Sequence, residues 1–175
     1  MKTVWIVHQY ASTVETGIGG RHFYLAQELV NQGFFVIGCS RSKSLFKHEN
    51  YLHFQVDINK ESEILSLFGE LKKRKFEIFG LINNAGIAKM MPLITTPTAS
   101  FLEMIKLNVL GTFIFQRESA KMMSLQKEGR IINFSSVANA LNIEWEGAYS
   151  ATKASVESLT KTAAREFQGL GITVN

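Results

Sequence analysis

Tyr149 and Lys153 are the two residues in this chain best suited by type and spacing to move a proton. They are four positions apart, and on a helix this spacing puts two side chains on one face, one turn apart. An ammonium group beside a phenol favours the phenolate, so the phenol exchanges its proton more readily. General acid–base catalysis requires such a group. The pair therefore predicts a proton-transfer site on a helix.

Three more polar motifs precede this pair along the chain. The sequence Asn83-Asn84-Ala85-Gly86 ends an apolar run, Asn108 lies in a predicted helix, and Ser136 ends the run that begins at Gly129. We interpret this second run as a buried parallel strand whose end presents a hydroxyl group. A Tyr-x-x-x-Lys pair alone is weak support for catalysis, because exposed helices carry such pairs by chance. Four motifs in this order and spacing are much more specific.

From about residue 36 onward, this constellation resembles the short-chain dehydrogenase/reductase family. The resemblance implies an oxidoreductase that transfers a hydride between nicotinamide and a carbonyl or alcohol substrate. Tyr149 would be the general acid/base, and Lys153 would support it and bind the nicotinamide ribose. Ser136 would donate a hydrogen bond to the carbonyl oxygen, and Asn108 would hold a water molecule that relays protons to Lys153. The resemblance implies no metal site.

Strand and helix patterns alternate along the chain. This alternation predicts an α/β fold with a doubly wound, Rossmann-like parallel sheet, in which ligands lie at the carboxyl ends of the strands. We expect one nucleotide-binding domain over residues 1–175. The expected strands are residues 3–7, 34–39, 51–56, 78–83, 130–137 and 172–175, and the expected helices are residues 19–32, 60–75, 98–125 (bent or broken near 108–111) and 147–168.

The residues after the second strand favour NADP over NAD. An NAD site usually has a carboxylate there, which bonds to the ribose 2′-hydroxyl. This chain has Ser40 and Arg41, which can donate to a 2′-phosphate. The alternative is that Arg41 is a solvated loop cation. By resemblance, Asp57 and Ile58 would line the adenine pocket, although Asp57 also suits the start of a helix. Asn84, Ala85 and Gly86 would lie against the cofactor ribose.

The first 33 residues depart from the family pattern. Gly17, Ile18 and Gly19 supply the second half of a phosphate-binding glycine loop, but Thr13 replaces its first glycine. Residues 1–33 look instead like the start of a GT-B-type glycosyltransferase, so a mosaic chain is one hypothesis. Two alternatives to the oxidoreductase follow: a module related to sugar transferases, and a Rossmann-like fragment that is impaired or non-catalytic.

Composition places further bounds on the protein. The net charge of +4 comes from scattered residues rather than a basic stripe, so we expect no nucleic-acid partner. A single cysteine and no run of about 20 apolar residues favour a cytoplasmic protein without a membrane span. By resemblance, the chain ends before the last strand of the family and is C-terminally incomplete, and an intact protein would be a homodimer or homotetramer. Residues 88–93, Leu141, Asn142 and Trp145 are expected to flank the substrate.

Overall fold

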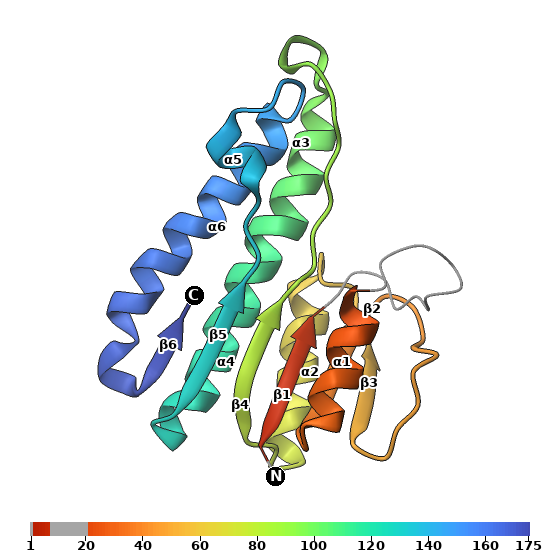
Figure 1. The fold of residues 1–175 in the computed structure, drawn as a ribbon, viewed down its shortest axis with the longest axis vertical. Coiled ribbons are helices and arrows are strands. Elements are labelled where there is room, and N and C mark those ends of the chain that lie inside the picture. Colours follow the sequence, from red (N-terminus) through yellow and green to blue (C-terminus); the bar gives the residue numbers. More distant parts are fainter. Residues whose placement is uncertain (1, 8–20) are drawn as a thin grey trace.

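The protein folds around one parallel β-sheet, as the alternating sequence pattern predicts. The computed structural model describes residues 2–7 and 21–175. Within them, six strands lie in the order β3-β2-β1-β4-β5-β6, and every neighbouring pair is parallel (Figure 1). The strand order reverses between β1 and β4, which is where open α/β sheets bind ligands. The strands are β1 (Thr3–Val7), β2 (Phe35–Ser40), β3 (Tyr51–Gln55), β4 (Ile78–Asn83), β5 (Gly129–Asn133) and β6 (Ile172–Val174).

Helices connect the strands and cover the sheet. A π-helix, Ile105–Gly111, joins α3 to α4 without a break, and this is the bend that the sequence predicts near residues 108–111. Short 3₁₀ turns occupy Leu93–Thr95 and Gln168–Leu170. The α-helices are α1 (Arg21–Asn31), α2 (Glu61–Lys73), α3 (Thr98–Met104), α4 (Thr112–Gln126), α5 (Val137–Leu141) and α6 (Gly147–Glu166).

The two faces of the sheet carry separate apolar clusters. The larger cluster joins α2, α4 and α6 to the sheet, and its most buried large side chains include Phe68, Phe115 and Leu81. The smaller cluster packs α1 against β1, β2 and β4 through Val30, Val36 and other side chains. Helix α2 buries an apolar stripe made of four residues: Ile64, Leu67, Phe68 and Leu71.

Several element ends differ from the sequence prediction. Gly33 follows α1 with φ +83°, a left-handed conformation that is typical of a glycine ending a helix. Thr96 does not cap α3, since α3 is preceded by Pro97 and the Thr96 hydroxyl donates back to the carbonyl of Pro92 at 2.8 Å. The proline supplies the fixed backbone angle of a helix start without a side-chain cap.

Strand β5 ends three residues before Ser136, which corrects the predicted strand over residues 130–137. Ser136 instead precedes α5, and its Oγ accepts a hydrogen bond from the Ala138 N–H at 3.2 Å. A serine at a helix start competes with strand continuation, because its hydroxyl satisfies a backbone donor of the first helical turn.

Within residues 2–7 and 21–175, one helix meets the length and composition of a membrane span, contrary to the expectation from the sequence. It is the continuous helix Thr98–Gln126, with a mean hydropathy of 1.3 in its most apolar window. The helix packs against β4 and β5, and Leu107, Ile114 and Phe115 belong to the larger core cluster. A helix buried against a sheet has this composition for the same reason as a membrane helix, since both face apolar surroundings.

Candidate active site

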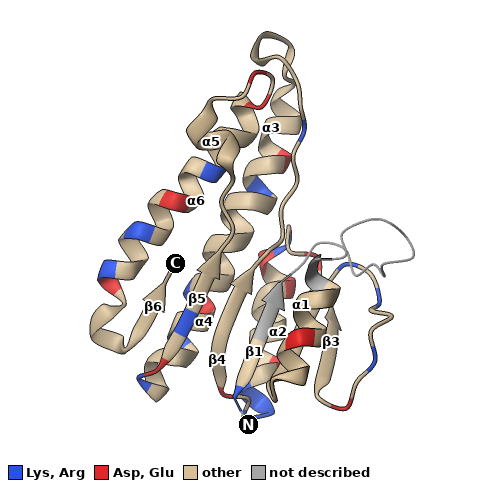
Figure 2. Ribbon diagram, in the orientation of Figure 1, with Lys and Arg blue, Asp and Glu red and all other residues tan. Residues whose placement is uncertain are grey.

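Two polar clusters lie at the carboxyl ends of the strands. The first surrounds Lys153 and Asn108 beyond β4 and β5, and the second surrounds His53 and Ser40 at the ends of β2 and β3. Parallel strands all end at one edge of the sheet, so both clusters face the edge where ligands bind in such folds. Lys and Arg residues are otherwise scattered over several elements (Figure 2).

Lys153 is the buried cation of the first cluster. Its side chain comes from α6, is only 6% exposed, and donates from Nζ to the carbonyl of Phe134 at 2.7 Å. Burial lowers the pKa of Lys153 from its ordinary value, because desolvation penalises the charged ammonium. Tyr149 lies one turn away on α6, and Lys153 Nζ is 5.9 Å from the centre of its ring. The predicted pairing of these two side chains on one helix face is therefore present.

Asn108 fixes the loop after β4. Its Oδ1 accepts from the Ile87 N–H at 2.8 Å, and its Nδ2 donates to the Ile87 carbonyl at 2.8 Å and to Thr152 Oγ1 at 3.0 Å. Asn108 lies in the π-helix, where the extra residue per turn changes the direction of a side chain. Its side chain bonds to protein groups of the loop and of α6, and its role in holding a water molecule stays a prediction.

Gly86 lies between these residues. A Cβ at this position would be 3.5 Å from Asn108 Oδ1 and 3.6 Å from Lys153 Nζ. Of the other residues predicted to contact the cofactor ribose, Asn84 is half-buried and Ala85 belongs to the larger core cluster. The glycine thus leaves space directly beside the buried amide and ammonium groups.

Ser136 reaches the same region through α5. The Ser150 hydroxyl donates to the Ala138 carbonyl at 3.1 Å, which ties the first turn of α5 to the turn of α6 that carries Tyr149. Ser136 is half-buried, and a hydroxyl that accepts at a helix start keeps its own O–H for donation. Ser135 is held separately, because its hydroxyl donates to Glu157.

A ladder of amide side chains lies beneath the first cluster. Asn83 Nδ2 donates to Asn133 Oδ1 at 2.8 Å, and Asn133 Nδ2 donates to Gln116 Oε1 and Thr160 Oγ1, each at 2.8 Å. The ladder joins β4, β5, α4 and α6. The sequence analysis missed this network. The only sign of this network in the sequence is that Gln116 and Thr160 are polar residues at positions that interrupt the apolar faces of their helices.

The second cluster contains the residues predicted to select the cofactor. Ser40 is 1% exposed, and its Oγ donates to the Ser42 carbonyl at 2.9 Å, while Arg41 lies exposed between these two residues. His53 on β3 contacts the same turn, with Nε2 2.9 Å from the Ser42 carbonyl. Burial lowers the pKa of His53 from its ordinary value, opposed by its bond to Ser42. The sequence analysis did not single out His53.

Asp57 and Ile58 follow β3 at the same edge. Asp57 Oδ1 accepts from the backbone and side chain of Asn59 at 3.1 and 3.0 Å, so it closes a turn rather than capping α2. The Ile58 side chain is 3% exposed and lies in the larger core cluster. Only the backbone of Ile58 is therefore positioned to line a pocket. The predicted phosphate-binding residues Gly17, Ile18 and Gly19, and Thr13, lie outside the described residues.

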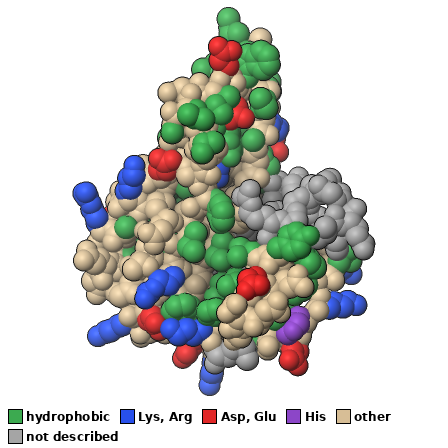
Figure 3. All heavy atoms as spheres, in the orientation of Figure 1, with side chains coloured by type: hydrophobic (Ala, Val, Ile, Leu, Met, Phe, Trp, Pro, Cys, Tyr) green, Lys and Arg blue, Asp and Glu red, His purple; other side chains and the backbone are tan. Residues whose placement is uncertain are grey.

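A cavity of about 460 Å³ involves some of the residues predicted to flank the substrate. It is lined by Leu93, Asn142 and Trp145 together with Ser150 and Ala151 of α6. Helical geometry places Ser150 and Ala151 on a different face of α6 from Tyr149 and Lys153. Hydrophobic side chains also gather on the projecting end of the molecule that carries α5 (Figure 3), where Leu93, Ile94, Leu141 and Trp145 are exposed.

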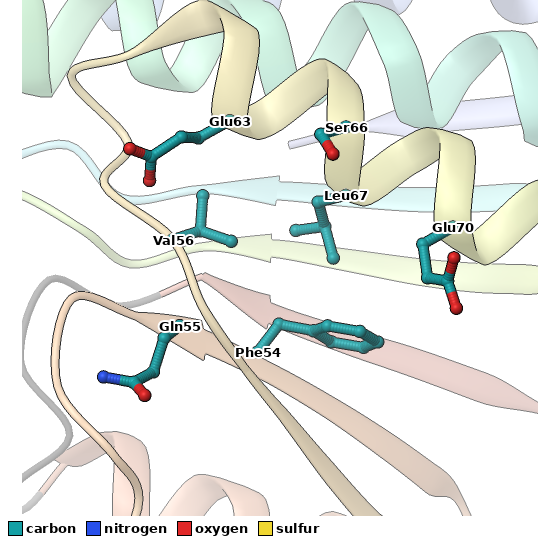
Figure 4. A pocket seen from close by; sticks show the side chains of 7 residues that line it. All are labelled: Phe54, Gln55, Val56, Glu63, Ser66, Leu67 and Glu70. Carbon is teal, nitrogen blue, oxygen red and sulfur yellow. The ribbon is translucent and has the colours of Figure 1, made fainter.

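A second hollow lies between β3 and α2 (Figure 4). Phe54 and Gln55 form one side, and Glu63 and Glu70 point toward it from α2. Both carboxylates already have cationic partners: Lys60 lies 2.8 Å from Glu63, and Arg74 lies 2.7 Å from Glu70. The hollow therefore offers no uncompensated charge to a ligand.

Comparison with known proteins identifies the relatives of the chain. A sequence profile described as short chain dehydrogenase matches residues 13–175. An uncharacterized oxidoreductase of Bacillus subtilis (strain 168), YxjF, is 30% identical over 178 residues, covering 97% of this chain and 69% of that protein. A diacetyl reductase [(S)-acetoin forming] of Staphylococcus epidermidis (strain RP62A) is 33% identical over 169 residues, covering 90% of this chain and 65% of that protein.

Solved structures show the same fold with a bound nucleotide. ElxO with NADP bound has a TM-score of 0.87 and 29% identity, and the match covers 100% of this chain and 72% of that one. A short chain dehydrogenase from Leptospira borgpetersenii serovar Hardjo-bovis (strain JB197), with bound NAD⁺, has a TM-score of 0.86 and 25% identity, covering 99% and 68%. These neighbours therefore include both nicotinamide cofactors.

The matches also correct the interpretation of residues 1–33. The family profile begins at residue 13 and the structural matches extend over the whole chain, whereas the resemblance to a glycosyltransferase in residues 1–33 gains no support. The reductase resemblance was placed too late, at about residue 36, because the altered glycine loop hid it. The chain spans 65% to 69% of the length of the two curated relatives.

Proposed function

Because the chain belongs to the short-chain dehydrogenase/reductase family, we propose that it is the catalytic part of an NADP-dependent oxidoreductase that interconverts a carbonyl group and an alcohol. The observation that carries this proposal is the first polar cluster. Tyr149 and Lys153 share one face of α6, and Lys153 is buried beside the carbonyl of Phe134. A buried ammonium one turn from a phenol is a costly arrangement for stability alone, which supports a chemical role.

In this proposal Tyr149 exchanges a proton with the substrate oxygen. It donates its phenolic proton when the carbonyl is reduced, and takes one back when the alcohol is oxidised. Lys153 stabilises the phenolate that forms, and the bond to Phe134 holds its ammonium group in place. Ser136 donates a hydrogen bond to the same substrate oxygen, which stabilises the charge that develops there. Asn108 holds the Ile87 backbone, and so keeps the loop at Gly86 open.

The residues at the sheet edge fit a dinucleotide. Gly86 leaves space beside Lys153 at the nicotinamide end, and the exposed Arg41 offers a guanidinium at the adenosine end, whereas the buried Ser40 hydroxyl already donates to the Ser42 carbonyl. When bound, the nicotinamide would supply the hydride. We propose NADP over NAD because the guanidinium of Arg41 suits a 2′-phosphate, whereas no carboxylate follows β2 to accept from a 2′-hydroxyl.

For the substrate we propose a small carbonyl compound or alcohol. The similarity to a diacetyl reductase supports small ketones as the first candidates. We also propose that the protein acts as a homodimer or homotetramer, because the long helix exposes apolar side chains away from the sheet: Leu102, Leu110 and Phe113.

The test is binding followed by turnover. The protein is titrated with NADPH and with NADH, and nicotinamide fluorescence reports binding. Reduction of diacetyl and other small ketones is then measured with wild type and with Tyr149→Phe. We expect tighter binding of NADPH and a loss of roughly 10²–10⁴-fold in kcat for Tyr149→Phe with little change in NADPH affinity. The control is Tyr24→Phe, an exposed tyrosine on α1. Equal rates for both variants would contradict the role of Tyr149.

A further inference from the structure

The second polar cluster contains a histidine that the proposed mechanism does not use. His53 and Tyr51 lie on one face of β3, and they extend over β2 at Gly38. A Cβ at position 38 would collide with the Tyr51 hydroxyl and lie 3.2 Å from His53 Nδ1. Gly38 therefore lets two aromatic rings lie across the neighbouring strand, close to its carboxyl end.

The hydrogen bonds define which nitrogen of His53 carries the proton. Nε2 is 2.9 Å from the Ser42 carbonyl, which can only accept, so Nε2 donates. Nδ1 is 3.1 Å from the Tyr51 hydroxyl and is left to accept from it. The same Ser42 carbonyl also accepts from Ser40 Oγ at 2.9 Å. A neutral ring thus bridges β3 to the turn that carries Arg41.

Apolar packing holds this bridge from the other side. Phe46, in the segment after the turn, contacts Tyr51 edge-on with ring centres 4.8 Å apart, and contacts Phe23 of α1 at 5.2 Å. The Ser40 hydroxyl is 3.2 Å from His53 Nε2 and is almost fully buried. The backbone from Ser40 to Ser42 is consequently held by side chains from β2 and β3 as well as by its own turn.

We infer that His53 is a positioning residue for cofactor selection, which fixes the turn from Ser40 to Ser42 so that the Arg41 guanidinium faces an adenosine ribose carrying a 2′-phosphate. The inference rests on the proposed NADP-dependent function. Two donors occupy the Ser42 carbonyl, so its lone pairs are engaged within the protein. Without His53, one lone pair would be free to turn toward a doubly charged phosphate and repel it. The turn would then be held to β3 and the residue after it by the Gln55 side chain, which donates to the Arg41 carbonyl at 3.3 Å, and by the backbone bond from Val56 to Ser40.

The experiment uses nucleotide fragments, so that no turnover is needed. Affinities for adenosine 2′,5′-bisphosphate and for adenosine 5′-monophosphate are measured by calorimetry, and their ratio is the readout. His53→Leu removes both ring nitrogens, whereas His53→Gln retains a donor that can reach the Ser42 carbonyl. His48→Leu is the matched control, because this exposed histidine lies in the same segment and bonds to the Asn50 N–H rather than to the turn.

For wild type we expect tighter binding of the bisphosphate. In His53→Leu we expect this preference to fall by about three- to tenfold, the range of one lost hydrogen bond. His53→Gln and His48→Leu should keep most of it. A ratio is insensitive to a partly unfolded sample, since unfolded protein lowers both affinities equally.

The outcomes distinguish a failure of the His53 inference from a failure of the NADP proposal. If wild type prefers the bisphosphate and His53→Leu keeps that preference, the role of His53 is wrong and the proposed cofactor stands. If wild type itself binds the monophosphate equally well or better, the NADP proposal fails, and the inference about His53 fails with it.

Discussion

The two polar clusters at the sheet edge are built in opposite ways. The cluster around Lys153 holds a charge: an ammonium that is 6% exposed, bonded to a backbone carbonyl and lying beside a π-helix. The cluster around His53 holds no buried charge, and it is closed by a neutral ring, two hydroxyl groups and a carbonyl. Burying a cation opposes folding, whereas a satisfied neutral network does not. We therefore expect loss of the Lys153 ammonium to affect chemistry most, and loss of the neutral hydrogen bonds around Asn108 and His53 to affect stability or binding.

The largest effect is expected for Lys153→Met. Removing the ammonium should reduce kcat by roughly 10²–10⁴-fold, because the phenolate loses its supporting charge. The melting temperature should change little, since the loss of the bond to Phe134 is offset by relief of the desolvation that lowers the pKa of Lys153. Calorimetric melting and a ketone-reduction assay test both parts. Lys161→Met, two turns further along α6, is the exposed control. A large fall in stability without loss of rate would show that Lys153 is structural.

Asn108→Leu should affect both activity and stability. It leaves the N–H and carbonyl of Ile87 without their side-chain partner in a buried region. We expect a loss of about 3 kcal/mol in the free energy of unfolding, measured in urea. Asn31→Leu, exposed near the end of α1, should change it by less than about 0.5 kcal/mol. Equal losses for the two variants would mean that the bonds to Ile87 contribute nothing.

In the second cluster, Gly38→Ala should destabilise the protein by about 1–3 kcal/mol. The added methyl group must displace the rings of Tyr51 and His53, which are held by Phe46 and the Ser40–Ser42 turn. Gly69→Ala provides a contrast, because nothing lies within 4 Å of its added methyl group in α2. This second change should stabilise the protein by about 0.5–1 kcal/mol. Urea unfolding of both variants gives the comparison, and the same sign for both would refute the steric argument at Gly38.

The smallest effect concerns pH. Burial lowers the pKa of His53 below its ordinary value of 6.5, so between these two values the unfolded chain binds more protons than the folded chain. The free energy of unfolding should therefore fall as the pH drops below about 6.5. Unfolding curves for wild type and His53→Gln at pH 8 and pH 5.5 isolate this contribution, because the other three histidines are common to both. Identical pH dependence in the two proteins would exclude it.

The sequence predicts the first cluster well and the second poorly, for a physical reason. Tyr149 and Lys153 meet through helical periodicity, and the strand β4 places Gly86 at the sheet edge, so local pattern suffices. His53 meets Ser42 only through the pairing of β2 with β3 and the path of the intervening segment. Strand register is a tertiary property that no local spacing encodes.

The ends of helices and strands also depend partly on local sequence and partly on tertiary contacts. The run 129–136 in the sequence continues past the end of β5. The Ser136 side chain caps a helix there, so α5 begins instead of the strand continuing. Conversely, the bend near residues 108–111 was predicted, but its form was not. A π-helix is stabilised by the contacts of its neighbours, here the bonds of Asn108 to Ile87 and Thr152, rather than by residue propensity.

The π-helix also has a consequence for how such a site is acquired. A π-helical turn accommodates about one residue more than an α-helical turn, and each α-helical residue turns the chain by about 100°. Deleting one residue from Ile105–Gly111 would therefore let an ordinary α-helix run through, with everything on its N-terminal side rotated relative to α4. A deletion on the C-terminal side of Asn108 would include Asn108 in this rotation and turn its side chain away from Ile87. A single inserted codon is thus a sufficient genetic step to convert a plain core helix into one that presents an amide at the sheet edge.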